Sequence, residues 1–206
     1  MSSVSINYMH VIGLTGGIAT GKSSVATMLE ELGAFVIDAD QLSRDVVASG
    51  SPVLSEICHC FGEDMLLQNG TLNRQKLRNL IFADQKKRQQ LEAILHPAIR
   101  LLALFRLEQA RQAGTKVVIY MAPLLIESGA TDRVDEVWVV TVQPEVQLER
   151  LMRRDTCNRD QAMQIITAQM PLAEKVRHGS TVIDNSGSLE ATREQVLVAW
   201  QQRIGL

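Results

Sequence analysis

A glycine-rich segment, Gly16 to Ser24, follows directly on the short apolar run His10 to Leu14. The run has no helical period and predicts a buried strand, whereas Lys22 to Leu32 carries apolar residues at three- and four-residue steps and predicts a helix. The segment between them matches the pattern G-x-x-x-x-G-K-[ST] in full. Strand, glycine-rich loop and helix in this order predict a phosphate-binding loop, because glycines bring backbone N–H groups against phosphate oxygens at the helix N-terminus.

The residue types in this loop suit a nucleoside triphosphate. Lys22 would neutralise charge on the β- and γ-phosphates, and the Ser23 hydroxyl is the expected ligand of Mg²⁺. The alternative is a glycine-rich turn with an accidental Lys-Ser pair, but the full pattern arises by chance in on the order of one in a hundred chains of this length. We therefore expect ATP to bind along the whole loop, that is, at Gly16, Gly17, Ile18, Ala19, Thr20, Gly21, Lys22, Ser23 and Ser24.

Apolar runs and helical patterns alternate through much of the remaining chain. Near-continuous apolar runs predict further buried strands at Phe35 to Asp38, Lys116 to Met121, Glu136 to Val142 and Thr181 to Ile183. Helical patterns cover Pro144 to about Arg154, Arg159 to Met170, and a last helix to Arg203 with Ser188 as its N-cap. This alternation predicts an α/β fold, a doubly wound parallel sheet of the P-loop NTPase type with helices on both faces.

One long stretch departs from the alternation. From Ala39 to Gln112 only helices are predicted, punctuated by Ser51-Pro52, Gly62, Gly70 and Pro97. The stretch is too long for one crossover connection, so part of it predicts a helical insertion. We expect a single domain over residues 1–206, with a nucleotide-binding core at 10–50 and 115–206, a helical lid at about 150–175 and a substrate-binding insertion at about 51–114.

Composition excludes several classes of partner. The 21 Lys and Arg residues against 23 Asp and Glu give a net charge of -2, and aromatic residues make up 4%, which argues against nucleic acid. Three cysteines cannot form a paired disulfide framework, Met1 to His10 lack the apolar run of a secretory signal, and no stretch is long and apolar enough to span a membrane. We expect a cytoplasmic protein with no membrane partner, and we interpret Cys58-His59-Cys60 as part of a helix rather than a metal site.

Two carboxylates stand at the end of the second predicted strand. Because the carboxyl ends of parallel strands form the ligand crevice, we expect Asp38 and Asp40 to face the phosphate loop. A kinase that acts on a hydroxyl needs a carboxylate there to accept the proton or to orient the nucleophile. The alternatives are that Asp40 is the N-cap of the next helix, and that Asp38 holds Mg²⁺-bound waters or a loop amide. The N-K-x-D motif of a switch GTPase is not found in the sequence.

Motifs along nearly the whole chain resemble those of bacterial dephospho-coenzyme A kinases. The opening L-T-G-G-I-x-[ST]-G-K-S with D-A-D about fifteen residues later is similar to the start of that family, with Ser24 where the family commonly has Thr. Four further segments resemble family motifs in the same order: Leu95 to Pro97 (L-H-P), Pro123 to Glu127 (P-L-L-x-E), Leu148 to Asp155 (the arginine-bearing lid) and Val182 to Gly187 (V-I-D-N-x-G).

The resemblance implies a reaction and residues that carry it. The expected activity is transfer of the ATP γ-phosphoryl group to the ribose 3′-hydroxyl of dephospho-CoA, giving CoA and ADP. By resemblance Asp40 takes the position of the catalytic base and Arg150 that of a phosphate-clamping arginine, acting with Lys22; an exposed helix arginine is the alternative for Arg150. Asp184 and Asn185 resemble the nucleotide-side segment and join the expected ATP-binding residues.

The inserted helices are expected to bind the acceptor, dephospho-CoA. By resemblance the substrate-binding residues are Asp38, Asp40, Arg44, His96 and Leu124, and further cations are available at Arg74, Lys76 and Arg78. His96 could equally cap a helix or lie in the core. We expect a monomeric enzyme that requires Mg²⁺ and acts on ATP and dephospho-CoA. The rival hypotheses are a P-loop kinase of a nucleotide or another small metabolite, and a non-catalytic ATP-binding sensor.

Overall fold

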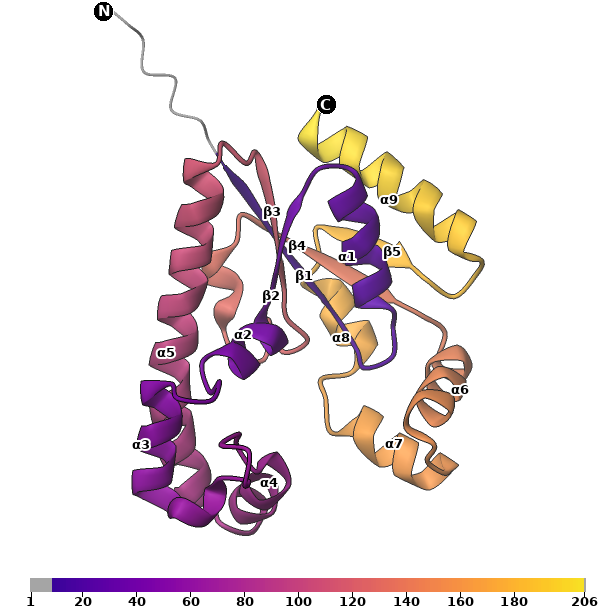
Figure 1. Cartoon of the computed structure of the whole chain (residues 1–206). Helices are drawn as coiled ribbons and strands as arrows, with labels where there is room; N and C mark the ends of the chain where they lie inside the picture. The colour runs from indigo at the N-terminus through magenta and orange to yellow at the C-terminus, as the bar shows by residue number, and fades with distance from the viewer. Residues whose placement is uncertain (1–8, 206) are drawn as a thin grey trace, which may run out of the picture. The chain divides into compact units, whose positions relative to one another are not determined.

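Five strands form one parallel sheet in the order β2-β3-β1-β4-β5 (Figure 1) in the computed structural model, which describes residues 9–205. The strands are β1 (His10–Gly16), β2 (Phe35–Asp38), β3 (Val117–Met121), β4 (Glu136–Thr141) and β5 (Thr181–Asp184). The central strand β1 pairs with β3 and β4, and its register places Gly16 opposite Val140. The predicted parallel α/β sheet is thus confirmed, and the strand bounds differ from those predicted by at most two residues.

Helices connect the strands and make up the rest of the fold. They are α1 (Lys22–Glu31), α2 (Ala39–Asp45), α3 (Pro52–Phe61), α4 (Arg74–Ala83), α5 (Gln85–Gln112), α6 (Pro144–Asp155), α7 (Arg159–Thr167), α8 (Leu172–Arg177) and α9 (Leu189–Ile204), with 3-10 turns η1 (Glu63–Met65) and η2 (Ala130–Arg133). Ser188 caps α9 by accepting a hydrogen bond from the Ala191 N–H, as predicted. Among residues 9–205, none of the helices combines the length and the apolarity that crossing a membrane requires.

The chain divides into two compact units, residues 1–37 with 110–206, and residues 38–109. In the first unit, α1 and α9 cover one face of the sheet (Figure 1), where Ile12 and Leu14 of β1 pack with Leu29 of α1 and Trp200 of α9. The other face of β1 is equally close-packed, because a Cβ on Gly13 would lie 2.5 Å from Cδ2 of Leu125. Burial on both faces explains why the strand reads as a continuous apolar run.

The second unit is helical and has a core of its own. Its centre contains Leu54 and Ile57 of α3, Met65 of η1 and Leu91 of α5. Pro97 does not separate two helices as predicted but lies inside α5. Proline removes the N–H that would bond the carbonyl of Ala93; both residues are exposed, so water can satisfy that carbonyl and the helix continues.

Three further predictions need correction or lie outside the structure. The short helix α8 was not predicted, and α7 ends at Thr167 rather than Met170. The strand β2 is not a fully buried strand, because it lies at the sheet edge and leaves Phe35 39% exposed. The predicted lack of a secretory signal rests largely on residues 1–8, which lie outside the described residues.

The carboxylate of Glu136 at the start of β4 joins three parts of the first unit. Its two oxygens lie 2.9 Å from Nε2 of His10 and 2.9 Å from the Ser180 Oγ, which donates to it. The Arg203 Nε lies 3.9 Å away. Burial alone would raise the pKa of Glu136, but the hydrogen bonds from His10 and Ser180 outweigh it and hold the pKa below its usual value of 4.5.

This lowered pKa predicts an acid-sensitive contribution of Glu136 to folding. The stabilisation is fully present above the ordinary carboxyl pKa of 4.5 and is lost as the pH falls through the lower folded-state pKa. In urea unfolding, wild type should therefore be more stable than Glu136→Gln at neutral pH, and the difference should shrink as the pH falls below 4.5. A difference that stays constant down to the acid unfolding transition would contradict the prediction.

Candidate active site

The glycine-rich loop joins the end of β1 to the start of α1, in the predicted place. Lys22, the first residue of α1, extends its ammonium group back over the loop and donates to the carbonyls of Gly16 (3.0 Å) and Gly17 (2.7 Å). The Thr20 hydroxyl, fully buried, donates to the Gly17 carbonyl at 2.9 Å. With its carbonyls so engaged, the loop holds a positive charge at the N-terminus of a helix, which is the environment that phosphate prefers.

Two glycines are required by the space around the loop. Gly16 has φ 152°, and a Cβ there would lie 2.4 Å from the Val140 carbonyl oxygen of β4. Gly21 has φ 87°, and a Cβ there would lie 2.1 Å from Nδ2 of Asn185. A side chain at either position would collide with these neighbours. The two glycines therefore allow the loop backbone to lie close to β4 and to the segment after β5.

Ser23 and Ser24 lie exposed in the first turn of α1. A serine hydroxyl is a hard oxygen ligand of the kind that Mg²⁺ takes together with phosphate oxygens and water. The exposed Ser23 hydroxyl, one residue after Lys22, therefore fits a metal that is bound chiefly through the nucleotide.

Asn185 supports the loop from below. Its Nδ2 donates to the Thr20 carbonyl at 2.8 Å, and its Oδ1 accepts from the Thr192 hydroxyl of α9 at 2.9 Å. Asn185 and Thr192 are both buried, so the Asn185 side-chain amide links the loop to α9 inside the protein. The preceding Asp184 is exposed and accepts hydrogen bonds from the N–H and hydroxyl of Ser186. A direct contact of Asp184 or Asn185 with the nucleotide stays a prediction.

Arg150 lies on α6 and is partly buried. It stands three residues after Gln147, one helical turn along, and the Gln147 side chain contacts the loop. Among the described residues, the Arg150 guanidinium has neither a hydrogen bond nor an ion pair. Arg154, by contrast, pairs with Asp155 through two hydrogen bonds of 2.7 and 3.1 Å. Arg150 is thus the better placed of the two to receive an anion.

Two glutamines that the sequence did not single out hold Ile18, near the apex of the loop. The Gln147 Nε2 donates to the Ile18 carbonyl at 2.8 Å, and the Ile18 N–H donates to Gln169 Oε1 at 2.8 Å. No local pattern marks these side chains, since Gln147 belongs to an ordinary helix and Gln169 to a predicted helix end.

A buried lysine was also missed. Lys175 of α8 is fully buried; its Nζ lies 2.6 Å from Glu127 Oε1 and donates to the Pro123 carbonyl at 2.7 Å. The hydroxyl of Thr15, at the end of β1, also donates to that carbonyl, at 3.3 Å. This cluster joins α8 to the loop after β3 next to the start of the phosphate loop.

Asp38 is the last residue of β2 and Asp40 follows two residues later, so both stand at the carboxyl end of the strand as predicted, but their local roles differ. Asp38 is the N-cap of α2 and accepts from the N–H groups of Asp40 (2.8 Å) and Gln41 (3.3 Å). The alternative in which Asp40 caps the helix is therefore wrong, because Asp40 is exposed in the first turn of α2. The N–H groups that Asp38 binds belong to the first turn of α2 rather than to a loop, so Asp38 has the capping role that was considered for Asp40.

The remaining predicted substrate residues are spread over separate elements. Arg44 is exposed in the last turn of α2, and Leu124 is 50% exposed after β3. His96 is exposed in the middle of α5, so it is neither a helix cap nor a core residue. Lys76 forms an ion pair with Asp64, which leaves fewer cations for an anionic acceptor.

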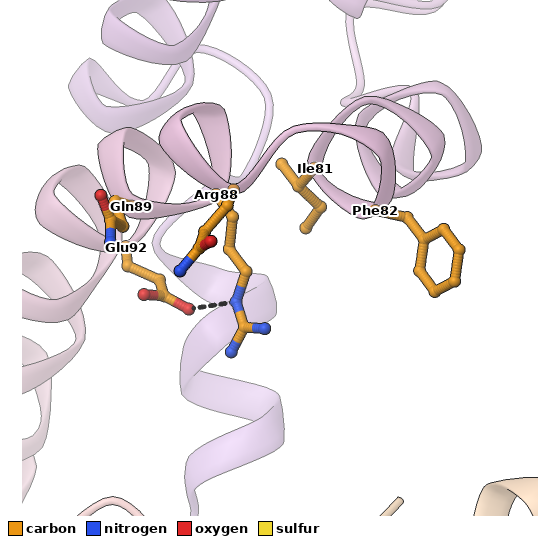
Figure 2. A pocket seen from close by; sticks show the side chains of 6 residues that line it. Ile81, Phe82, Arg88, Gln89 and Glu92 are labelled. Carbon is orange, nitrogen blue, oxygen red and sulfur yellow. Dashed lines mark hydrogen bonds and ion pairs between the residues drawn. The ribbon is translucent and has the colours of Figure 1, made fainter.

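A pocket of about 420 Å³ lies where α4 meets α5, lined by Ile81, Phe82, Gln85, Arg88, Gln89 and Glu92. Figure 2 shows the Arg88 and Glu92 side chains directed toward each other, with the Arg88 Nε 2.8 Å from Glu92 Oε1. The pair is an i, i+4 ion pair on a solvent-accessible face of α5. The pocket is lined by none of the residues predicted to bind the acceptor.

The segment Cys58-His59-Cys60 lies in α3, as predicted. Cys58 is buried, and burial together with the nearby Glu63 raises the pKa of its thiol. A thiol that resists deprotonation is a poor metal ligand. Within residues 9–205 no group of three or more potential His, Cys, Asp or Glu ligands comes together.

The parallel sheet, the loop between β1 and α1, and Lys22 at the first position of the helix define a P-loop kinase-type protein. The family model for dephospho-CoA kinase matches residues 10–191, and the chain belongs to that family. A dephospho-CoA kinase of Geobacter sulfurreducens is 52% identical over 95% of this chain and 99% of its own length.

Solved structures agree with this assignment. A crystal structure of a Thermus thermophilus protein superimposes with a TM-score of 0.84 at 30% identity, covering 96% of this chain and 98% of that one. The dephospho-CoA kinase of Campylobacter jejuni gives a TM-score of 0.71 at 25% identity, over 95% of this chain and 98% of that one. The family match over residues 10–191 includes the phosphate loop, Gln147, Gln169, Lys175 and the helical unit.

Removing the support under the loop should weaken both folding and nucleotide binding. Asn185→Ala leaves the Thr20 carbonyl and the Thr192 hydroxyl without their partner in a buried site, which costs about 2 kcal/mol. Asn185→Asp should be worse, because it also places a buried carboxylate against the Thr20 carbonyl oxygen. Urea unfolding and ATP titration measure the two effects. Asn79→Ala, at an exposed asparagine of α4, is the control and should change stability by less than about 0.5 kcal/mol.

Proposed function

We propose that the chain transfers the γ-phosphoryl group of ATP to the ribose 3′-hydroxyl of dephospho-CoA, yielding CoA and ADP. The observation that carries the proposal is the phosphate loop with Lys22 folded over it, in a chain whose dephospho-CoA kinase family match extends over residues 10–191. The loop alone supports only nucleotide binding. The match through the helical unit supports the choice of acceptor.

The loop would bind the β- and γ-phosphates of ATP. The N–H groups at the start of α1 would donate to phosphate oxygens, and the Lys22 ammonium would exchange the Gly16 and Gly17 carbonyls for phosphate oxygens when nucleotide binds. This exchange leaves the ammonium satisfied in both states, so no buried charge is stranded without nucleotide.

Ser23 is the residue that would hold Mg²⁺ with the nucleotide. Bound there, the metal would supply charge neutralisation across the β- and γ-phosphates. Ser23 is exposed at the second position of α1, beside Lys22, which suits a ligand shared between protein, phosphate and water.

Asp40 is the proposed catalytic base. Its carboxylate would accept the proton of the 3′-hydroxyl as that oxygen attacks the γ-phosphorus and the bond to ADP breaks. Because Asp38 satisfies the first N–H groups of α2, the Asp40 side chain is not needed as a cap. Arg150 is proposed to neutralise charge on the phosphoryl group in transit, which its unpaired guanidinium supports.

The acceptor is proposed to bind through Asp38, Arg44, His96 and Leu124, with residues 51–114 as the substrate-binding insertion. The segment at about 150–175, which contains the second half of α6, all of α7 and the first part of α8, is the proposed lid that excludes water from the reaction. We further propose a monomer that acts in the cytoplasm, which the three unpaired cysteines Cys58, Cys60 and Cys157 support.

The activity is tested by ADP release from Mg-ATP with and without dephospho-CoA, with the product identified by mass. We expect acceptor-dependent ADP and a product heavier by one phosphoryl group. ADP release that responds to another hydroxyl compound instead would favour a different small-molecule kinase. ATP binding without acceptor-dependent ADP from any compound in a screen would favour a nucleotide sensor.

Lys22→Ala should abolish measurable turnover, a loss of at least about a thousandfold, because the charge on the β- and γ-phosphates is then uncompensated. Steady-state ADP release measures the loss. Lys116→Ala, at an exposed lysine before β3, is the matched control and should keep wild-type activity. Turnover within tenfold of wild type in the Lys22 variant would rule out its assigned role.

Asp40→Asn should lower kcat by about 10²- to 10⁴-fold with ATP affinity nearly unchanged, because the amide cannot accept the hydroxyl proton. Rapid-quench kinetics and ATP titration separate the two parameters. Asp45→Asn, on the same helix, is the control. The Asp45 carboxylate accepts a hydrogen bond from the Gln41 side chain. Near-wild-type kcat in Asp40→Asn would remove the base assignment.

A further inference from the structure

The apex of the phosphate loop is held from outside the loop. Both backbone groups of Ile18 are engaged: its carbonyl accepts from Gln147 Nε2 and its N–H donates to Gln169 Oε1, each at 2.8 Å. The two glutamines come from α6 and from the turn after α7. The Ile18 N–H is therefore engaged by the protein rather than directed freely at a phosphate.

The next residue, Ala19, has a backbone conformation that side chains disfavour. Its φ is 58°, in the left-handed region, and within residues 9–205 only Thr156 is another non-glycine residue with positive φ. A left-handed residue in a tight turn lets successive N–H groups converge on an anion. Because a Cβ opposes this conformation, contacts elsewhere must hold Ala19 in it.

Those contacts come from α6 and α7. The side chains of Ile18 and Ala19 pack against an apolar cluster that contains Leu148, Leu151 and Ala162 of α6 and α7. Gln147 is itself buried, and it lies so close to the loop that a Cβ on Gly17 would be 2.7 Å from its Nε2. The fit leaves Gln147 little freedom to move away from the Ile18 carbonyl.

Gln169 is presented from an anchored backbone. The N–H of Met170 donates to Glu127 Oε1 at 3.4 Å, and the same oxygen lies 2.6 Å from Nζ of the buried Lys175. Lys175 also donates to the Pro123 carbonyl after β3. The residue next to Gln169 is thus held to the segment after β3, and the side-chain oxygen of Gln169 accepts from Ile18 from an anchored position.

We propose that Gln147 and Gln169 are positioning residues that clamp the Ile18 peptide and so keep Ala19 in the left-handed conformation that the anion-binding loop needs. They act on the phosphates of the nucleotide through the loop backbone. The proposal rests on the phosphate-binding role of the loop proposed above, and it makes Gln147 and Gln169 supports of the nucleotide-binding loop before any closure.

The first test compares ligands with and without phosphate. Gln169→Ala, and Gln169→Met as a variant of similar size, should weaken ADP binding about three- to tenfold, the effect of one lost hydrogen bond, and should leave adenosine binding unchanged. Gln147→Met should act in the same direction. Gln164→Ala, at an exposed glutamine of α7, is the matched control and should bind both ligands as wild type does. Calorimetry measures each dissociation constant, and thermal unfolding checks that each variant is folded.

The second test separates positioning from direct contact. Glycine adopts the left-handed conformation without a Cβ penalty, so Ala19→Gly should reduce the dependence on the clamp. Gln169→Ala should then weaken ADP binding less in the Ala19→Gly background than in wild type. An equal loss in both backgrounds would mean that Gln169 contacts the phosphates directly and would overturn the positioning role.

ADP binding at wild-type affinity in folded Gln169→Ala and Gln169→Met would also overturn the proposal. So would an equal weakening of ADP and adenosine binding. Because these measurements need no acceptor and no turnover, they can fail while acceptor-dependent ADP release succeeds, and the reverse. The clamp and the proposed dephospho-CoA kinase activity are thus tested separately.

Discussion

The close approach of the phosphate loop to its neighbouring strand ends is the constraint on which the site depends. Parallel pairing of β1 with β4 sets Gly16 opposite Val140, whose carbonyl oxygen occupies the space that a Cβ on Gly16 would take. On the far side, Asn185 after β5 fills the space beside Gly21 and bonds the Thr20 carbonyl. The register of the sheet therefore determines the shape of the loop, and glycine is the only residue that this register tolerates at both points.

Residues whose partners are near in sequence, or whose pattern is periodic, could be predicted; those defined by distant partners could not. The loop and the strands were predictable because a parallel sheet buried on both faces leaves continuous apolar runs. The helix α8 escaped prediction because it is short and its one fully buried residue is Lys175. Gln169 escaped for another reason, since its partner, Ile18, lies 151 residues away.

Lys175 shows what a buried charge can contribute to a site. Its ammonium is fully buried between Glu127 and the Pro123 carbonyl. Much of the attraction between Lys175 and Glu127 therefore only offsets the cost of removing the two charged groups from water. A pair of apolar side chains could stabilise the packing of α8 equally, but apolar contacts are not directional and would not fix α8 in one position. A lysine that must meet one carboxylate and one carbonyl docks α8 in a single register on the loop after β3. That register in turn places Met170, and with it Gln169, beside the phosphate loop.

The two carboxylates of the D-A-D segment have different places in the fold. Asp38 is the last residue of β2 and the N-cap of α2, so one carboxylate ends the strand and starts the helix. A cap must accept from backbone N–H groups, and the Asp38 Oδ1 does so for Asp40 and Gln41. The hydrogen bond to the Asp40 N–H orients its backbone while its carboxylate stays exposed in the first turn. Both cap hydrogen bonds end on Asp38 and orient its carboxylate toward the first turn of α2, so the proton transfer proposed above is assigned to the exposed carboxylate of Asp40 and not to the capping one.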